Sequence, residues 1–189
     1  MRNKKIKPLP LPLKTAIRWA LFVLIAILFA AFSTAGSGES SKAYALIPLS
    51  MAVAVFSGEI ESAAFGGLCG ILTDVATGQL IGFAAVYLCL ISGLISALFR
   101  QFLRKNFINY LALTVAALII YLYIDYFFYY RIWDYEGYTT VLGARFVPGA
   151  LKTFVWMPIV FFAAKLIVHL TSDIRPLNIE ETDEKIDRV

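Results

Sequence analysis

Six apolar segments, separated by short polar stretches, constrain the fold of this chain more than any other feature of its sequence. In the hydrocarbon core of a bilayer every backbone N–H and C=O must find a partner within the protein, so each segment is expected to be helical. A membrane β-barrel would instead show short segments of alternating polarity. The sequence therefore predicts an all-α polytopic membrane protein with six transmembrane helices, formed by residues 16–35, 44–56, 62–76, 80–99, 107–130 and 149–170.

The overall composition supports a membrane location. Hydrophobic residues make up 60% of the 189 positions and charged residues only 16%. Soluble domains have roughly 45–50% apolar and about 25% charged residues. A chain of this composition has too few polar side chains to cover the surface of a water-soluble fold, so we expect a multi-pass membrane protein.

Two of the apolar segments, 44–56 and 62–76, are shorter than the roughly 17–25 residues of an ordinary transmembrane helix. They are expected to thin the bilayer locally or to form a helical hairpin shielded by its neighbours. The stretch between them contains Glu59 and Glu61. Two carboxylates are too polar for the bilayer centre, which places this turn at the membrane interface.

The distribution of basic residues predicts that both termini lie in the cytoplasm. The N-terminal residues are basic, and the loop between the fourth and fifth segments carries a basic cluster of Arg100, Arg104 and Lys105. Basic loops stay in the cytoplasm, and these basic residues flank apolar segments, so they indicate contact with anionic lipid rather than nucleic acid. The predicted organisation is a basic cytoplasmic segment (1–15), a six-helix transmembrane domain (16–171) and an acidic cytoplasmic tail (172–189).

Candidate residues for catalysis or metal binding are scarce. Cys69 and Cys89 both lie within apolar segments, and His169 is the only histidine. A disulfide framework, a zinc site or a Ser-His-Asp triad needs more such residues in polar, convergent positions. We therefore expect no catalytic residue, no metal and no cofactor, and we expect that the protein is not an enzyme.

Small residues recur at a spacing of four in the middle of the chain, at Gly66, Gly70, Asp74, Gly78 and Gly82. On a helix this spacing forms a slowly rotating stripe. Small side chains in such a stripe allow a second helix to approach closely. The pattern predicts a surface for packing within the bundle or for contact with a partner, and the sequence leaves both open. Gly78 is expected in the turn that follows the third segment.

Two carboxyl groups lie within or beside apolar segments. An acidic side chain at such a position is costly unless it meets water, a helix N-terminus or a hydrogen-bond donor. Asp74 is therefore expected to cap the next helix or to join a buried polar network, with a role in transport as the alternative. Asp125, near the outer end of the fifth segment, also needs such a partner, and Arg131 or Arg145 is a candidate.

The loop that follows the fifth segment is the largest external feature and a candidate contact surface. It is rich in aromatic and basic residues, which are typical of membrane–water interfaces. Its candidate contact residues are Asp125, Arg131, Trp133, Tyr135 and Arg145.

The residues Phe56-Ser57-Gly58-Glu59, then Gly66-x3-Gly70-Ile71-Leu72-x-Asp74, then Gly78 and Gly82, form one extended motif. This motif resembles the central signature of the MreD family. The resemblance is specific to residues for about 48–93, and it extends as a hydropathy pattern over about 15–170. The chain's size, number of helices and cytoplasmic termini resemble the family too.

The resemblance implies a non-enzymatic scaffold of the rod complex, or elongasome, in the bacterial plasma (inner) membrane. An MreC-like protein would be its partner in peptidoglycan synthesis and cell shape, with MreB, RodA and a class B penicillin-binding protein as indirect partners. The family also resembles the substrate-binding subunits of energy-coupling-factor transporters. A subunit of a small-solute (vitamin-type) transporter is therefore the alternative function.

Overall fold

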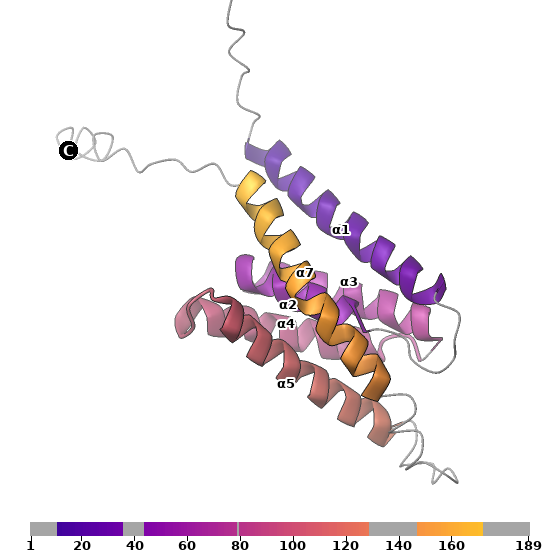
Figure 1. The fold of residues 1–189 in the computed structure, drawn as a ribbon. Coiled ribbons are helices and arrows are strands. Elements are labelled where there is room, and N and C mark those ends of the chain that lie inside the picture. The colour runs from indigo at the N-terminus through magenta and orange to yellow at the C-terminus, as the bar shows by residue number, and fades with distance from the viewer. Residues whose placement is uncertain (1–10, 36–43, 79, 129–146, 172–189) are drawn as a thin grey trace, which may run out of the picture.

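The computed structural model describes residues 11–35, 44–78, 80–128 and 147–171, and every regular element in this part of the chain is helical (Figure 1). The predicted all-α fold class is therefore confirmed for the described residues. The α1 N-terminus and the α7 C-terminus point to the same end of the bundle. The helices are α1 (Leu11–Ala35), α2 (Leu46–Phe56), α3 (Glu59–Thr77), α4 (Phe83–Gln101), α5 (Phe107–Tyr126) and α7 (Val147–Thr171).

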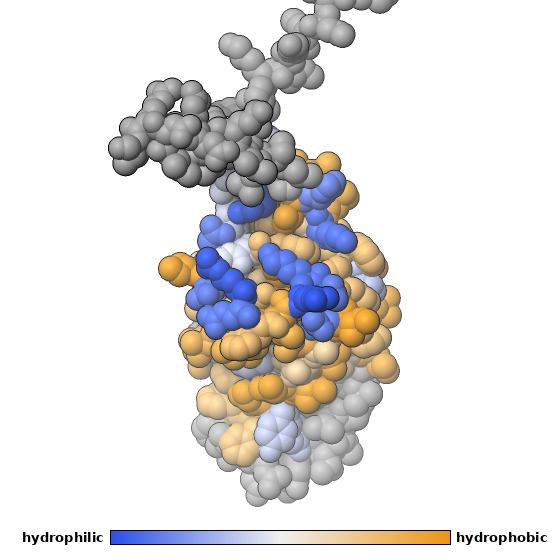
Figure 2. Space-filling view, turned by 90° about the vertical axis from the view of Figure 1, so that its left-hand side faces the viewer, coloured by the Kyte–Doolittle hydropathy of each residue, from blue (hydrophilic) through white to orange (hydrophobic). Residues whose placement is uncertain are grey.

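Four of these helices are long and apolar enough to cross a membrane, namely α1, α4, α5 and α7. Many of their large apolar side chains point outward, among them Leu28, Leu90 and Ile119. Hydrophobic residues accordingly cover much of the surface in Figure 2. Soluble proteins rarely expose so much contiguous apolar surface. The 11-residue α2 is shorter, so the prediction of six complete transmembrane helices stays a prediction.

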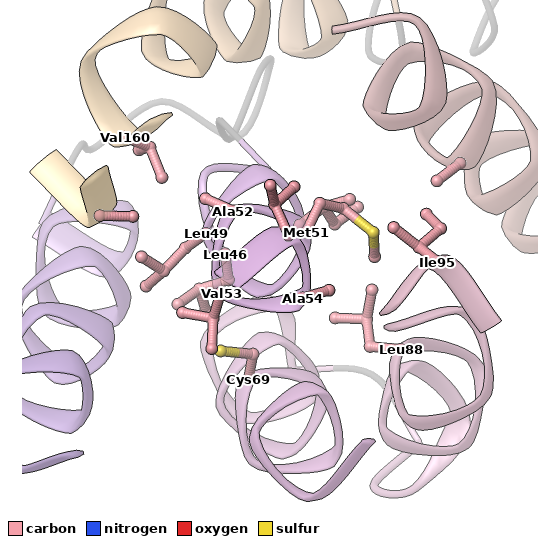
Figure 3. Packing of buried hydrophobic residues seen from close by; sticks show 14 of the residues in the cluster. Leu46, Leu49, Met51, Ala52, Val53, Ala54, Cys69, Leu88, Ile95 and Val160 are labelled. Atoms are coloured by element: carbon pink, nitrogen blue, oxygen red, sulfur yellow. The ribbon is translucent and has the colours of Figure 1, made fainter. Parts of the chain in front are cut away.

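The short helix α2 occupies the centre of the bundle. Each residue from Leu46 to Val55 is buried, and α2 contacts α1, α3, α4, α5 and α7. Figure 3 shows side chains of the surrounding helices directed toward it, including Cys69 of α3, Leu88 of α4 and Val160 of α7. A helix that is apolar on all sides belongs in such an enclosed position.

Side chains of other helices bond the backbone at both ends of α2. Before its first turn, the Tyr44 N–H donates to Thr153 Oγ1 of α7 at 2.9 Å. After its last turn, the Ser96 hydroxyl of α4 donates to the Ser57 carbonyl oxygen at 2.9 Å. These bonds matter because the end groups of a helix have no partner within the helix itself.

The Tyr110 hydroxyl forms a third link, which joins α2, α5 and α7. It donates to the Pro48 carbonyl oxygen at 3.0 Å and lies 3.3 Å from the Met157 carbonyl oxygen. Pro48 is tolerated in α2 because it lies in the first turn, where the missing N–H would have no helical partner. The central helix is thus fixed by polar contacts as well as by apolar packing.

Candidate functional site

The glycine motif forms the tightest helix contact in the described structure, where α3 packs against α4. A β-carbon added at Gly66 would lie 2.5 Å from Ser92 Oγ, and one added at Gly70 would lie 2.5 Å from the Ala84 carbonyl oxygen. Side-chain atoms do not approach that closely, so only glycine permits this contact at either position. The structure places both glycines in the interior of the bundle.

Asp74 links α3 to the start of α4, near the turn that joins the two helices. The side chain is fully buried, and both of its oxygens accept hydrogen bonds from the start of α4. The Gly82 N–H donates to Oδ2 at 2.8 Å, and the Ala84 N–H donates to Oδ1 at 3.0 Å. A carboxylate is favourable here because the first N–H groups of a helix are unpaired and carry partial positive charge. Of the roles expected for Asp74, the structure shows helix capping.

The remaining two glycines of the motif shape the turn between the helices. Gly78 ends α3 with φ +68°, and Gly82 precedes α4 with φ +110°. Residues with a β-carbon rarely adopt this left-handed region, whereas glycine does so freely. The motif thus has three local tasks in the α3–α4 hairpin, namely close approach, chain reversal and helix capping.

The predicted basic cluster divides into two parts in the structure. Arg100, at the end of α4, and Lys105, in the α4–α5 loop, line a hollow of about 290 Å³, whereas Arg104 does not. The Lys105 ammonium lies 6.0 Å from the centroid of the Phe56 ring. Figure 2 looks onto this end of the bundle and shows hydrophilic residues gathered within a hydrophobic surround. The full lining is Val55, Phe56, Ser57, Gly58, Ser96, Phe99, Arg100 and Lys105.

A second hollow, of about 420 Å³, lies between α1 and α3 and is apolar over most of its lining. We call it the α1–α3 groove. At the side of this groove, the ring centroids of Trp19 and Phe65 lie 5.9 Å apart. Glu61 is the acidic residue of the lining, and one of its oxygens lies 3.9 Å from an Arg18 guanidinium nitrogen. The groove is lined by Trp19, Val23, Ile60, Glu61, Ala64, Phe65 and Leu68.

Sequence reasoning missed this groove, because nothing in the residues indicates that α1 lies beside α3. The sequence shows the small Ala64 next to the large Phe65, but this pair indicates a groove only once the neighbouring helix is known.

The predicted external contact surface is described in part. Asp125 is 1% exposed in the last turn of α5. Its proposed partners Arg131 and Arg145, and the neighbouring Trp133 and Tyr135, lie outside the described residues. Their role at an external surface stays a prediction.

Groups suited to metal or redox chemistry are not assembled in the described part of the chain. No three His, Cys, Asp or Glu side chains there are close enough to hold a metal ion. Cys69 and Cys89 are free thiols. Asp74 is engaged by backbone N–H groups, and its position suits capping rather than proton transfer.

Comparisons with protein families, with curated proteins and with solved structures found no match for this chain. The resemblance to the MreD signature therefore depends on the residues of the motif, and the function must be argued from those residues and from the geometry around them.

Proposed function

We propose that this chain is a non-enzymatic membrane scaffold of the bacterial rod complex, which works with an MreC-like protein in peptidoglycan elongation and the regulation of cell shape. The motif between Phe56 and Gly82 suggests the family. The observation that carries the choice of a scaffold over a transporter subunit is the complete enclosure of α2 at the centre of the bundle.

A solute-binding subunit needs a cavity of about 300–1,000 Å³ with convergent polar groups. Here the side chains of α2 occupy the middle of the bundle. Two polar groups at α2 are directed to the backbone: the Ser50 hydroxyl donates to the Ile47 carbonyl oxygen, and the Tyr110 hydroxyl donates to the Pro48 carbonyl oxygen. They fix helices in place and leave no polar side chain of α2 for a solute.

The partner is expected to dock away from the glycine motif, because Gly66 and Gly70 are already covered by α4. The α1–α3 groove is better suited to this task. Its apolar lining and the small Ala64 fit one apolar transmembrane helix, which small residues allow to approach closely. Glu61 is 49% exposed at its side chain. It favours a partner helix with a basic residue at its cytoplasmic end, where such residues are common.

We infer the bacterial plasma membrane as the location, with both termini in the cytoplasm. Arg18 lies beside Glu61, and Arg100 and Lys105 lie beside the α2–α3 turn. Basic residues from three parts of the chain therefore meet at the end of the bundle that holds this turn. The positive-inside rule assigns that end to the cytoplasm. MreB, RodA and a class B penicillin-binding protein are then expected to associate through the MreC-like partner.

The test is affinity purification of the tagged full chain in mild detergent, with mass spectrometry of the proteins that accompany it. We expect an MreC-like protein with the wild-type chain and with Ala112→Trp, a control on the exposed face of α5. Ala64→Trp should fill the groove and reduce recovery of this partner at least tenfold.

Each of the other results has a defined meaning. Recovery of ATPase subunits with a membrane coupling protein would replace the scaffold with the transporter subunit. Equal recovery of the MreC-like protein with Ala64→Trp and Ala112→Trp would keep the scaffold and reject the groove.

A further inference from the structure

The hollow beside the α2–α3 turn has the features of a binding site for an anion. We propose that it binds the phosphate group of an anionic phospholipid at the cytoplasmic end of the bundle. Arg100 and Lys105 approach it from α4 and from the α4–α5 loop, while Ser57 and Gly58 approach it from the turn. This site is independent of the partner surface in the α1–α3 groove.

Arg100 and Lys105 are the two basic side chains that line the hollow. Within the described residues neither Arg100 nor Lys105 forms an ion pair; Glu61 of the neighbouring turn pairs with Arg18 instead. The Lys105 ammonium lies over the face of the Phe56 ring, 6.0 Å from its centroid, which attracts the ammonium without neutralising it. Two cations that line one hollow attract an anion, and phosphate oxygens accept hydrogen bonds well from both types of side chain.

The carbonyl oxygens of the turn already accept hydrogen bonds, so neither of them faces the hollow as an unpaired acceptor that would repel an anion. The Ser57 carbonyl oxygen already accepts from the Ser96 hydroxyl at 2.9 Å. The Gly58 carbonyl oxygen already accepts from the Ser62 N–H at 2.8 Å and from the Ser62 hydroxyl at 2.7 Å. The Ser57 hydroxyl oxygen, in contrast, is inaccessible to solvent and has no hydrogen-bond partner among the described residues. Because this oxygen is inaccessible, an anion could reach it only after a shift of the turn, so Arg100 and Lys105 carry the proposed site.

The start of α3 contributes Gly58 to the lining of the hollow. Its first turn carries Glu59 and Glu61, so the proposed site depends on Arg100 and Lys105 and not on the partial charge of this helix end.

The rest of the lining favours a lipid over free phosphate. Val55, Phe56 and Phe99 form the apolar part of the hollow. A lipid can place its phosphate near the cations and its glycerol and upper acyl chains against these apolar groups. Free phosphate would use the cations alone.

Native mass spectrometry of the purified full chain tests the site, with phosphatidylglycerol and phosphatidylcholine added in equal amounts. We expect the wild-type chain to retain phosphatidylglycerol preferentially. Arg100→Ala and Lys105→Ala should each reduce this retention about fivefold, the factor that corresponds to about 1 kcal/mol per basic residue near an anionic membrane. Arg104→Ala is the matched control, since it removes the same charge from the same loop but does not line the hollow.

Equal losses in all three variants would overturn the site, because they would indicate attraction by net charge alone. No preference for phosphatidylglycerol in the wild-type chain would overturn it too. Displacement of the lipid by millimolar inorganic phosphate would reject the lipid as the occupant. All three side chains are exposed, so the variants are expected to fold, and unchanged elution in gel filtration checks this.

Discussion

The replacement Asp74→Ala tests whether the buried carboxylate stabilises the α3–α4 hairpin. It removes the acceptor of two N–H groups, those of Gly82 and Ala84. Hydrogen bonds to charged groups contribute about 1.5–3 kcal/mol each. Water can replace the bond to the half-buried Gly82, which suggests the lower value, whereas Ala84 is fully buried and suggests the upper one. The expected loss is about 4.5 kcal/mol.

Reversible unfolding in mixed micelles of a mild detergent and dodecyl sulfate measures this loss, followed by circular dichroism. Asp74→Asn retains one acceptor oxygen and should lose about half as much. Thr73→Val is the matched control: Thr73 is buried beside Asp74, but its hydroxyl bonds only to the Cys69 carbonyl oxygen of its own helix. We expect its effect to stay below about 1 kcal/mol.

A loss below about 1 kcal/mol for Asp74→Ala would refute the capping argument. It would mean that water or a rearranged turn satisfies both N–H groups. A large and equal loss for Thr73→Val would attribute the effect to disturbance of α3 in general.

Two further predictions concern the packing of the same bundle. Gly70→Ala should destabilise the protein by about 3 kcal/mol or more in the same unfolding assay, because its β-carbon would collide with the backbone of α4. Gly67→Ala should change stability by less than about 1 kcal/mol, since a β-carbon there would lie 3.7 Å from Cys89 Cβ, an ordinary contact. Equal losses of stability in Gly70→Ala and Gly67→Ala would reject the argument that α3 and α4 approach closely at Gly70. Tyr110→Phe should cost about 1–2 kcal/mol through loss of the bond to the Pro48 carbonyl oxygen, and an unchanged unfolding midpoint would remove this link from the account.

Local signals in the sequence predicted the helices and the turn at Gly78 well. The apolar segments correspond to the observed helices, and the capping role of Asp74 was among the predicted alternatives. The main differences are at helix ends. The predicted segment 62–76 begins at Glu59 in the structure, because Glu59 and Glu61 suit the first turn of a helix. Polar residues that end an apolar segment therefore need not end the helix.

Long-range packing could not be predicted from the same signals. Tyr44 and Thr153 bond across 109 positions of sequence, and nothing in the apolar composition of α2 indicates which helices enclose it. The sequence predicted that α2 either thins the bilayer or forms a hairpin with α3 that its neighbours shield, whereas burial on all sides places α2 at the centre of the bundle. The α1–α3 groove and the lipid hollow depend on the same kind of contact. They became visible only with the arrangement of the helices.

Depletion of this protein in its own host, with cell width and new peptidoglycan incorporation followed by microscopy, tests the proposed scaffold most directly. The account predicts that depleted cells widen and lose incorporation along their sides. The wild-type chain and Ala112→Trp should restore both, whereas Ala64→Trp should not. Depleted cells that keep a normal width and a normal pattern of wall synthesis would contradict the proposed function.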